Sequence, residues 1–162
     1  MSDEMERKLT LFFETYAQHM NDALGERPVV DVGEVAAQFA DYFVEASPVG
    51  VQGGSNGDEF RAMIPRGYEF YRKIGTQSMK LNISEMTQLD DFHYMAKVHW
   101  TAEYLTRAET REVIEFDVIY FLQLLDEDRT PRIFAYITGD EQRILRERGL
   151  IDPEAISAGV IG

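Results

Sequence analysis

Residues 92–104 read FHYMAKVHWTAEY, and this stretch decides the fold. Apolar and polar residues alternate along it, and successive side chains of a β-strand point to opposite faces. One face would carry Phe92, Tyr94, Ala96, Val98, Trp100, Ala102 and Tyr104. The other would carry His93, Lys97, His99, Thr101 and Glu103. The pattern predicts a long strand with an aromatic face toward the core and a polar face toward water.

The same periodicity continues along the second half of the chain. It predicts strands at about 77–89, 92–106, 111–125 and 131–138. The segments between them are short and rich in turn-forming residues. Consecutive strands are therefore expected to pair antiparallel.

Helical patterns precede these strands. Apolar residues spaced by three and four over residues 3–24 predict an amphipathic helix. Asp31 is expected to cap a short second helix whose core face includes Phe39. A capping-box pattern at residues 55–59 predicts the start of a third helix, which Pro65 should kink or split. The helices thus come before the long strands and are available to cover them.

The remaining segments complete an α+β pattern. A bent strand pair is expected over residues 42–52, and Gly75 is expected to end the third helix. Asp140 should cap a terminal helix over residues 140–148, with one further short turn at 152–153. The predicted fold class is α+β, with N-terminal helices on a strongly curved, mainly antiparallel sheet and a short C-terminal helix.

Length and composition indicate a globular domain. With 162 residues, 44% of them hydrophobic, the chain can bury one sizeable core. We interpret residues 1–162 as one domain, with its core at about 9–138 and a C-terminal helical extension at 140–162. The acidic start of the chain is not typical of a signal peptide, and no apolar run reaches the length of a membrane span.

The charge balance limits the classes of partner. A net charge of −13 disfavours nucleic acid and anionic membrane surfaces, because both are bound by neutralising phosphates with basic residues. The absence of cysteine excludes disulfides and thiolate chemistry and fits a reducing compartment, so we expect a cytoplasmic protein. Glycines 50–57 lack the lysine and the spacing of a phosphate-binding loop. His93 and His99 would lie about 20 Å apart on one strand, too far to share a metal ion. We expect neither a metal nor another cofactor.

Two short segments and the order of elements resemble a known superfamily. Residues 16–21, YAQHMN, are similar to the first helix of ketosteroid isomerases, and residues 44–50, VEASPVG, to the segment that carries their catalytic aspartate. Together with the predicted order of elements, the chain from about residue 9 to 137 resembles the cone-shaped α+β barrel of the NTF2-like superfamily. That superfamily includes ketosteroid isomerases, SnoaL-type polyketide cyclases and scytalone dehydratases. The resemblance implies a homodimer formed through the sheet.

The resemblance implies only part of a catalytic site. Ketosteroid isomerases use an aspartate base together with a tyrosine and a protonated aspartate that donate hydrogen bonds. Tyr16 stands where the family has its tyrosine, but Ser47 stands where the family has its base. No carboxyl group occurs at residues 118–121, and alternation places Asp117 on the face opposite Phe116 and Val118. Steroid isomerisation by the known mechanism is therefore not expected.

The candidate site residues follow from the aromatic face and the first helix. Tyr16 and His19 lie one helical turn apart and form the candidate acid/base pair, although a lone histidine at a helix end is more often a surface residue. The candidate ligand-binding residues are Phe12, Tyr16, Met20, Ser47, Val98, Trp100, Tyr104, Phe116, Val118 and Tyr120. The alternative for the aromatic residues is core packing between helices and sheet.

Two hypotheses of function follow. In the first, the protein binds a small hydrophobic molecule in an aromatic-lined pocket and is either a pure binder or an isomerase, cyclase or dehydratase that lacks the aspartate base. In the second, it is a non-catalytic dimeric interaction module whose cavity is filled by side chains. A void of a few hundred Å³ beside Tyr16 and Trp100 would favour the first hypothesis, and a packed interior the second.

Overall fold

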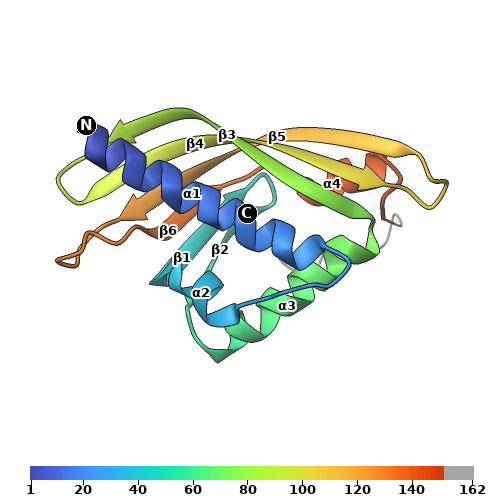
Figure 1. The fold of residues 1–162 in the computed structure, drawn as a ribbon, viewed down its shortest axis with the longest axis horizontal. Helices are drawn as coiled ribbons and strands as arrows, with labels where there is room; N and C mark the ends of the chain where they lie inside the picture. Colours follow the sequence, from blue (N-terminus) through green and yellow to red (C-terminus); the bar gives the residue numbers. More distant parts are fainter. Residues whose placement is uncertain (152–162) are drawn as a thin grey trace.

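A computed structural model describes residues 1–151 of the chain (Figure 1). The elements in chain order are α1 (Asp3–Leu24), α2 (Val32–Ala37), β1 (Phe39–Ser47), β2 (Gly50–Ser55), α3 (Asp58–Lys73), β3 (Thr76–Gln88), β4 (His93–Leu105), β5 (Arg111–Gln123), β6 (Arg132–Ile137) and α4 (Glu141–Glu147). The predicted α+β class is confirmed. Residues 152–162, which include the turn expected at 152–153 and most of the predicted C-terminal extension, lie outside the described residues.

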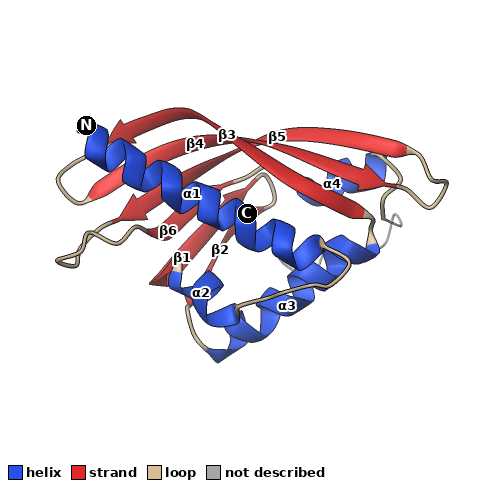
Figure 2. Cartoon of the chain, viewed as in Figure 1, coloured by secondary structure: helices blue, strands red, loops and turns tan. Residues whose placement is uncertain are grey.

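The strands form one mixed sheet in the order β2-β1-β6-β5-β4-β3 (Figure 2). From β3 to β6, consecutive strands pair antiparallel, as predicted, whereas β1 lies parallel to β6. The sheet is open, so β2 and β3 are its edges. Trp100 lies at the middle of β4 and pairs with Phe116 of β5 and Leu81 of β3. The predicted alternation in β4 and β5 sets the face that these strands turn toward the helices.

The core lies between this face and the helices α1 and α3 (Figure 1). On α1 the buried residues recur every three or four positions, at Leu9, Phe13, Tyr16, Met20 and Ala23. On β4 they are the alternate residues Tyr94, Ala96, Val98, Trp100, Ala102 and Tyr104. Both periodicities match those predicted, and together they place a wall of aromatic rings beneath α1.

Asn21 fastens the C-terminal half of α1 to the edge strand β3. Its side-chain amide donates to the carbonyl oxygens of Ala17 (2.9 Å) and Met79 (2.8 Å), and its carbonyl accepts from the Met79 N–H (2.9 Å). A side chain that satisfies both backbone groups of an edge residue acts as a short extra strand. These hydrogen bonds fix the position of Met20 and Leu24 along the sheet.

Three local expectations were wrong. Phe92 is 47% exposed, because Asp90 accepts the backbone N–H groups of both Phe92 and His93 (each 2.8 Å) and so holds Phe92 in a turn before β4. Phe39 is buried, but it begins β1 rather than belonging to α2. The N-cap of α3 is Gly57, which makes no side-chain capping bond.

Pro65 does not split α3, which is continuous from Asp58 to Lys73. A proline inside a helix removes one backbone hydrogen bond. Ile64, Tyr68 and Tyr71 are buried next to Pro65 and one or two turns beyond it, so packing against the core holds the helix together through the missing bond.

The short helix α4 closes one end of the structure (Figure 1). Asp140 accepts the N–H of Arg143 (3.1 Å) as the predicted N-cap, and Gly149 follows the helix with a φ of 71°. Arg148 forms an ion pair with Glu112 of β5 (3.0 Å), and Leu145 is buried. These contacts hold α4 against the end of the sheet where α3 passes into β3.

Within residues 1–151, no helix is both long enough and apolar enough to span a membrane.

Candidate functional site

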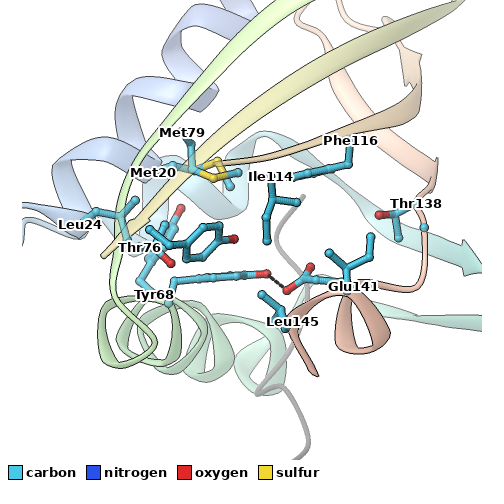
Figure 3. A pocket seen from close by; sticks show the side chains of 14 residues that line it. Met20, Leu24, Tyr68, Thr76, Met79, Ile114, Phe116, Thr138, Glu141 and Leu145 are labelled. Carbon is cyan, nitrogen blue, oxygen red and sulfur yellow. Dashed lines mark hydrogen bonds between the residues drawn. The ribbon is translucent and has the colours of Figure 1, made fainter. Parts of the chain in front are cut away.

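A pocket opens between α4 and the end of the sheet, close to the C-terminal ends of α1 and α3 (Figure 3). The described residues that line it are Met20, Leu24, Tyr68, Tyr71, Thr76, Met79, Tyr104, Ile114, Phe116, Thr138, Gly139, Glu141, Ile144 and Leu145. Its volume is about 40 Å³, which limits the enclosed part of a ligand to a compact group. In this state the pocket can enclose only a few non-hydrogen atoms.

The wall of the pocket is largely apolar, with a few polar groups at fixed places. Met20 and Met79 face Leu145 across the space, and Ile114 projects between them (Figure 3). Tyrosine and threonine hydroxyls add polar points to the wall. Glu141, the first residue of α4, supplies the carboxyl group. An apolar cavity with a few placed polar groups is the usual form of a small-molecule site.

A tyrosine holds this carboxyl group in place. The hydroxyl of Tyr71, on α3, donates to Oε1 of Glu141 across 2.5 Å (Figure 3). Glu141 is partly buried and its carboxyl group turns inward from the start of α4 (Figure 3). Close to it, the hydroxyl of Tyr136 donates to Oε2 of Glu45 (3.3 Å). Two carboxyl groups and two tyrosines from four different elements therefore meet at this end of the protein.

Burial controls the charge of these groups. It raises the pKa of Glu141 from 4.5 to about 7, an effect opposed by the Tyr71 hydrogen bond and reinforced by the Glu45 carboxylate. Burial also raises the pKa of Glu45, against the hydrogen bond from Tyr136. The Tyr71 pKa lies well above its usual value because of burial and the nearby Glu141. Near pH 7 the Glu141 carboxyl is thus poised to give or take a proton, which is the property of a general acid or base.

The structure brings three of the predicted ligand-binding residues to this pocket. Met20 of α1, Tyr104 of β4 and Phe116 of β5 all line it. Phe12 is partly buried against Phe13 on α1, with ring centroids 5.2 Å apart. Ser47 lies at the end of β1, where its hydroxyl accepts from the Val49 N–H (3.3 Å) in the turn to β2.

Tyr16, Val98, Trp100, Val118 and Tyr120 form the packed centre of the core. Among the described residues, neither Tyr16 nor Trp100 lines the pocket, so the packing at this place favours the hypothesis of a filled interior over a ligand cavity beside Tyr16. The Tyr16 ring centroid lies 6.0 Å from that of Trp100 and 5.9 Å from that of Tyr120, and Trp100 Nε1 donates to the Tyr120 hydroxyl (3.1 Å). Burial raises the pKa of Tyr16, so its hydroxyl stays protonated at neutral pH. Among the described residues, that hydroxyl has no hydrogen-bond partner of normal geometry.

His19 points away from this centre. Its Nε2 lies 3.6 Å from Oε2 of Glu34 on α2, and 14% of its side chain is exposed. Tyr16 faces Trp100 and Tyr120 instead. The catalytic pairing of Tyr16 with His19 stays a prediction.

Solved structures with the same architecture are known. No protein-family model matches the chain, and neither does any curated protein. A ketosteroid isomerase-like protein from Erwinia carotovora atroseptica is 14% identical, with a TM-score of 0.60 over 85% of this chain and 97% of that one. An NTF2-like superfamily protein from Salmonella enterica is 11% identical, with a TM-score of 0.58 over 85% and 92%. A domain of unknown function with a cystatin-like fold from Nostoc punctiforme is 15% identical, with a TM-score of 0.61 over 95% and 91%.

The chain has the NTF2-like fold. The predicted resemblance is confirmed at the level of architecture. Identities of 11–15% show the fold and not the activity. The function of this protein therefore depends on the chemistry of its own side chains.

Glu141 is the residue of this site that the sequence reasoning missed. It stands one position after the helix cap Asp140, and the sequence predicts for it only a place in the terminal helix. A signal was present, because Glu141 shares one helical face with Ile144 and Leu145, three and four residues later. An acid on the apolar face of a short helix indicates a carboxyl group turned toward the core.

The raised pKa of Glu141 predicts how stability depends on pH. In the folded protein Glu141 keeps its proton up to about pH 7, whereas in the unfolded chain it loses it near 4.5. The free energy of unfolding should fall as pH rises between these two values, by at most about 3 kcal/mol. Urea denaturation of the wild type and Glu141→Gln at several pH values would measure the difference. The variant should equal the wild type near the lower pH and exceed it at the upper.

The matched control is Glu147→Gln, on the exposed side of the same helix, where Glu147 pairs with Arg143 (3.0 Å). His99, whose pKa is raised by hydrogen bonds to Asp117 and Glu115, also contributes stability that is lost as pH rises. That contribution is common to all three proteins and cancels in the comparison. Equal pH profiles for the wild type and Glu141→Gln would contradict the prediction.

Proposed function

We propose that this protein binds a small, largely apolar molecule in the pocket beneath α4. The observation that carries the proposal is the Glu141 carboxyl, held by Tyr71 inside a wall that is otherwise mostly apolar and aromatic. Burying a carboxyl beside apolar side chains is costly, and carboxyl groups whose pKa is shifted by burial are concentrated at functional sites. A ligand that fills the pocket would bury its apolar part against this wall and form a hydrogen bond with the carboxyl.

The volume of the pocket limits the part of the ligand that it encloses. About 40 Å³ accommodates a short aliphatic group but not a fused ring system. A larger molecule would require α4 to move outward, since Glu141, Ile144 and Leu145 form one wall. The proposal therefore favours compact ligands, or a compact group of a longer ligand.

A catalytic form of this proposal uses Glu141 for proton transfer. Isomerase, cyclase and dehydratase reactions need a group that takes a proton at one position and returns it at another. The Glu141 pKa of about 7 suits proton transfer near neutral pH. Glu141 lies in α4, whereas Ser47, which stands where the family has its aspartate base, lies in β1. With a substrate in hand, Glu141→Gln should abolish turnover. Tyr16→Phe tests the role predicted for Tyr16 in the same assay.

Filling the pocket tests whether a ligand binds there. Ile114 projects into the space, so Ile114→Phe should block it, and any small molecule that copurifies with the wild type should be missing from the native mass spectrum of the variant. Val113 is the matched control, because it is 48% exposed on the opposite face of β5 and Val113→Phe leaves the pocket open. Copurified ligand in equal amounts in both variants, or its absence from the wild type, would count against the proposal.

An apolar area on the outer face of the sheet favours the second candidate function, a dimeric interaction module. Met95 lies opposite Phe121 and Ile119 opposite Ile137, and the rings of Phe121 and Phe134 are 6.1 Å apart. Ile137 is 44% exposed. A homodimer through this face would cover these side chains. Sedimentation of the wild type beside Phe121→Lys tests it, and a wild-type monomer would reject it.

A further inference from the structure

The Glu141 carboxyl lacks a positive partner. None of the described residues that line the pocket is a lysine, arginine or histidine, and within residues 1–151 Glu141 forms no ion pair. Another acid, Glu45, is close enough to raise the Glu141 pKa. Buried charges in proteins are normally paired. The pocket thus contains an acidic group without a basic partner among the described residues.

The side chains around this carboxyl suit a cation. Four aromatic residues, Tyr68, Tyr71, Tyr104 and Phe116, line the pocket together with Met20 and Met79. The faces of aromatic rings carry negative potential and attract ammonium groups, most strongly where water is excluded. An anion would meet the Glu141 carboxyl, with the Glu45 carboxyl close to it, and no basic residue among the described lining. Charge alone therefore disfavours acids as ligands and favours amines.

The Thr76 hydroxyl is a second polar group of the wall that has capacity for another hydrogen bond. Thr76 is 3% exposed and lines the pocket, and its hydroxyl interacts with that of Tyr104 without a hydrogen bond of normal geometry within residues 1–151. A buried hydroxyl without a well-formed hydrogen bond is destabilising. An ammonium group carries three N–H donors and could satisfy this oxygen as well as the carboxylate.

We propose that the occupant of the pocket is a compact aliphatic amine, bound as an ammonium ion by Glu141, the hydroxyl of Thr76 and the surrounding aromatic rings. This inference rests on the proposed function, and it adds the charge and the chemical class of the ligand. The groups that face Glu141 are Tyr71 from α3, Glu45 from β1, Tyr104 from β4 and Tyr136 from β6. Burial keeps the tyrosines protonated, so the two carboxyl groups set the charge of the site.

Three probes of nearly equal size and different charge test the inference: n-butylamine, 1-butanol and butanoate. Binding would be followed by the NMR signals of the methyl groups of Met20, Met79 and Ile114, which line the pocket. At about pH 8 the amine is charged and Glu141 is mostly ionised. Butylamine should shift these signals with an affinity roughly tenfold or more above that of butanol, and butanoate should not shift them. The affinity for butylamine should fall as pH is lowered to about 6, because Glu141 takes up a proton.

Variants on α4 and α3 assign the effect to Glu141. Glu141→Gln should lower the affinity for butylamine roughly tenfold and leave the affinity for butanol unchanged. Glu147→Gln should change neither affinity. Tyr71→Phe keeps the carboxyl but removes the hydrogen bond that lowers its pKa. In that variant, butylamine binding should be weaker at about pH 7 and recover at about pH 9.

The outcomes separate this inference from the proposed function. Equal affinities for butylamine and butanol, or butylamine binding that survives Glu141→Gln, would overturn the amine assignment and leave a general apolar site. Pocket signals that respond to no probe would overturn both. A butylamine preference that depends on Glu141 and on pH, as described, would support both.

Discussion

Replacing Gly75 by alanine should destabilise the protein by about 3 kcal/mol or more, because a side chain has no room there. Gly75 lies between α3 and β3 with a φ of 92°, a conformation that residues with a Cβ rarely adopt. A Cβ at this position would lie 2.0 Å from the carbonyl oxygen of Leu105. The backbone cannot move aside easily, because the Leu105 N–H donates to the Gly75 carbonyl (2.8 Å). Urea denaturation followed by circular dichroism would measure the loss.

Gly54→Ala is the control for the Gly75 prediction. Gly54 lies in β2 with ordinary backbone angles, and a Cβ there would meet no atom within 4 Å. Its replacement should change the free energy of unfolding by less than about 1 kcal/mol. Similar urea midpoints for Gly75→Ala and the wild type would show that the turn between α3 and β3 adjusts freely.

The long strands were predictable because their signal is local. Alternation along 92–104 and 111–125 set which residues face the core, since a slip of one residue would have turned Trp100 and Val118 to water. The parallel pairing of β1 with β6 had no such signal. These strands are far apart in the chain, so their pairing depends on the closure of the whole sheet and not on a turn between them. Phe92 was misplaced because Asp90 imposes a turn that periodicity does not encode.

The pocket was harder to place than the wall around it. Periodicity identifies the residues on the inner face, but a hollow forms only where those residues fail to fill the space. Tyr16, Trp100 and Tyr120 are large enough to fill the centre of the core. The space lies instead where Thr76 pairs with Tyr104 at the end of the sheet and α4 closes above it. Its location depends on α4 and on side-chain volumes, and neither follows from the aromatic pattern.

Replacing Trp100 by alanine should cost about 3–5 kcal/mol, the range for removing a large side chain from a packed core. Trp100 is fully buried in the middle of β4, against the rings of Tyr16 and Tyr120. Its loss opens a cavity and leaves the Tyr120 hydroxyl without its Nε1 donor. Trp100→Phe keeps one aromatic ring and should cost less, about 1–3 kcal/mol, because it removes the indole donor and leaves a smaller cavity than alanine does.

Thr101→Ala is the matched control for Trp100, because it changes the adjacent residue on the outer face of the same strand. It should change the free energy of unfolding by less than about 1 kcal/mol. Trp100 is the only tryptophan of the chain, so unfolding must be followed by circular dichroism rather than by fluorescence. If the centre of the core is as tightly packed as the ring contacts indicate, the three variants rank Trp100→Ala, Trp100→Phe and Thr101→Ala in decreasing loss. A loss at Trp100→Ala no larger than at Thr101→Ala would mean that this region is loose enough to hold the ligand cavity expected beside Tyr16.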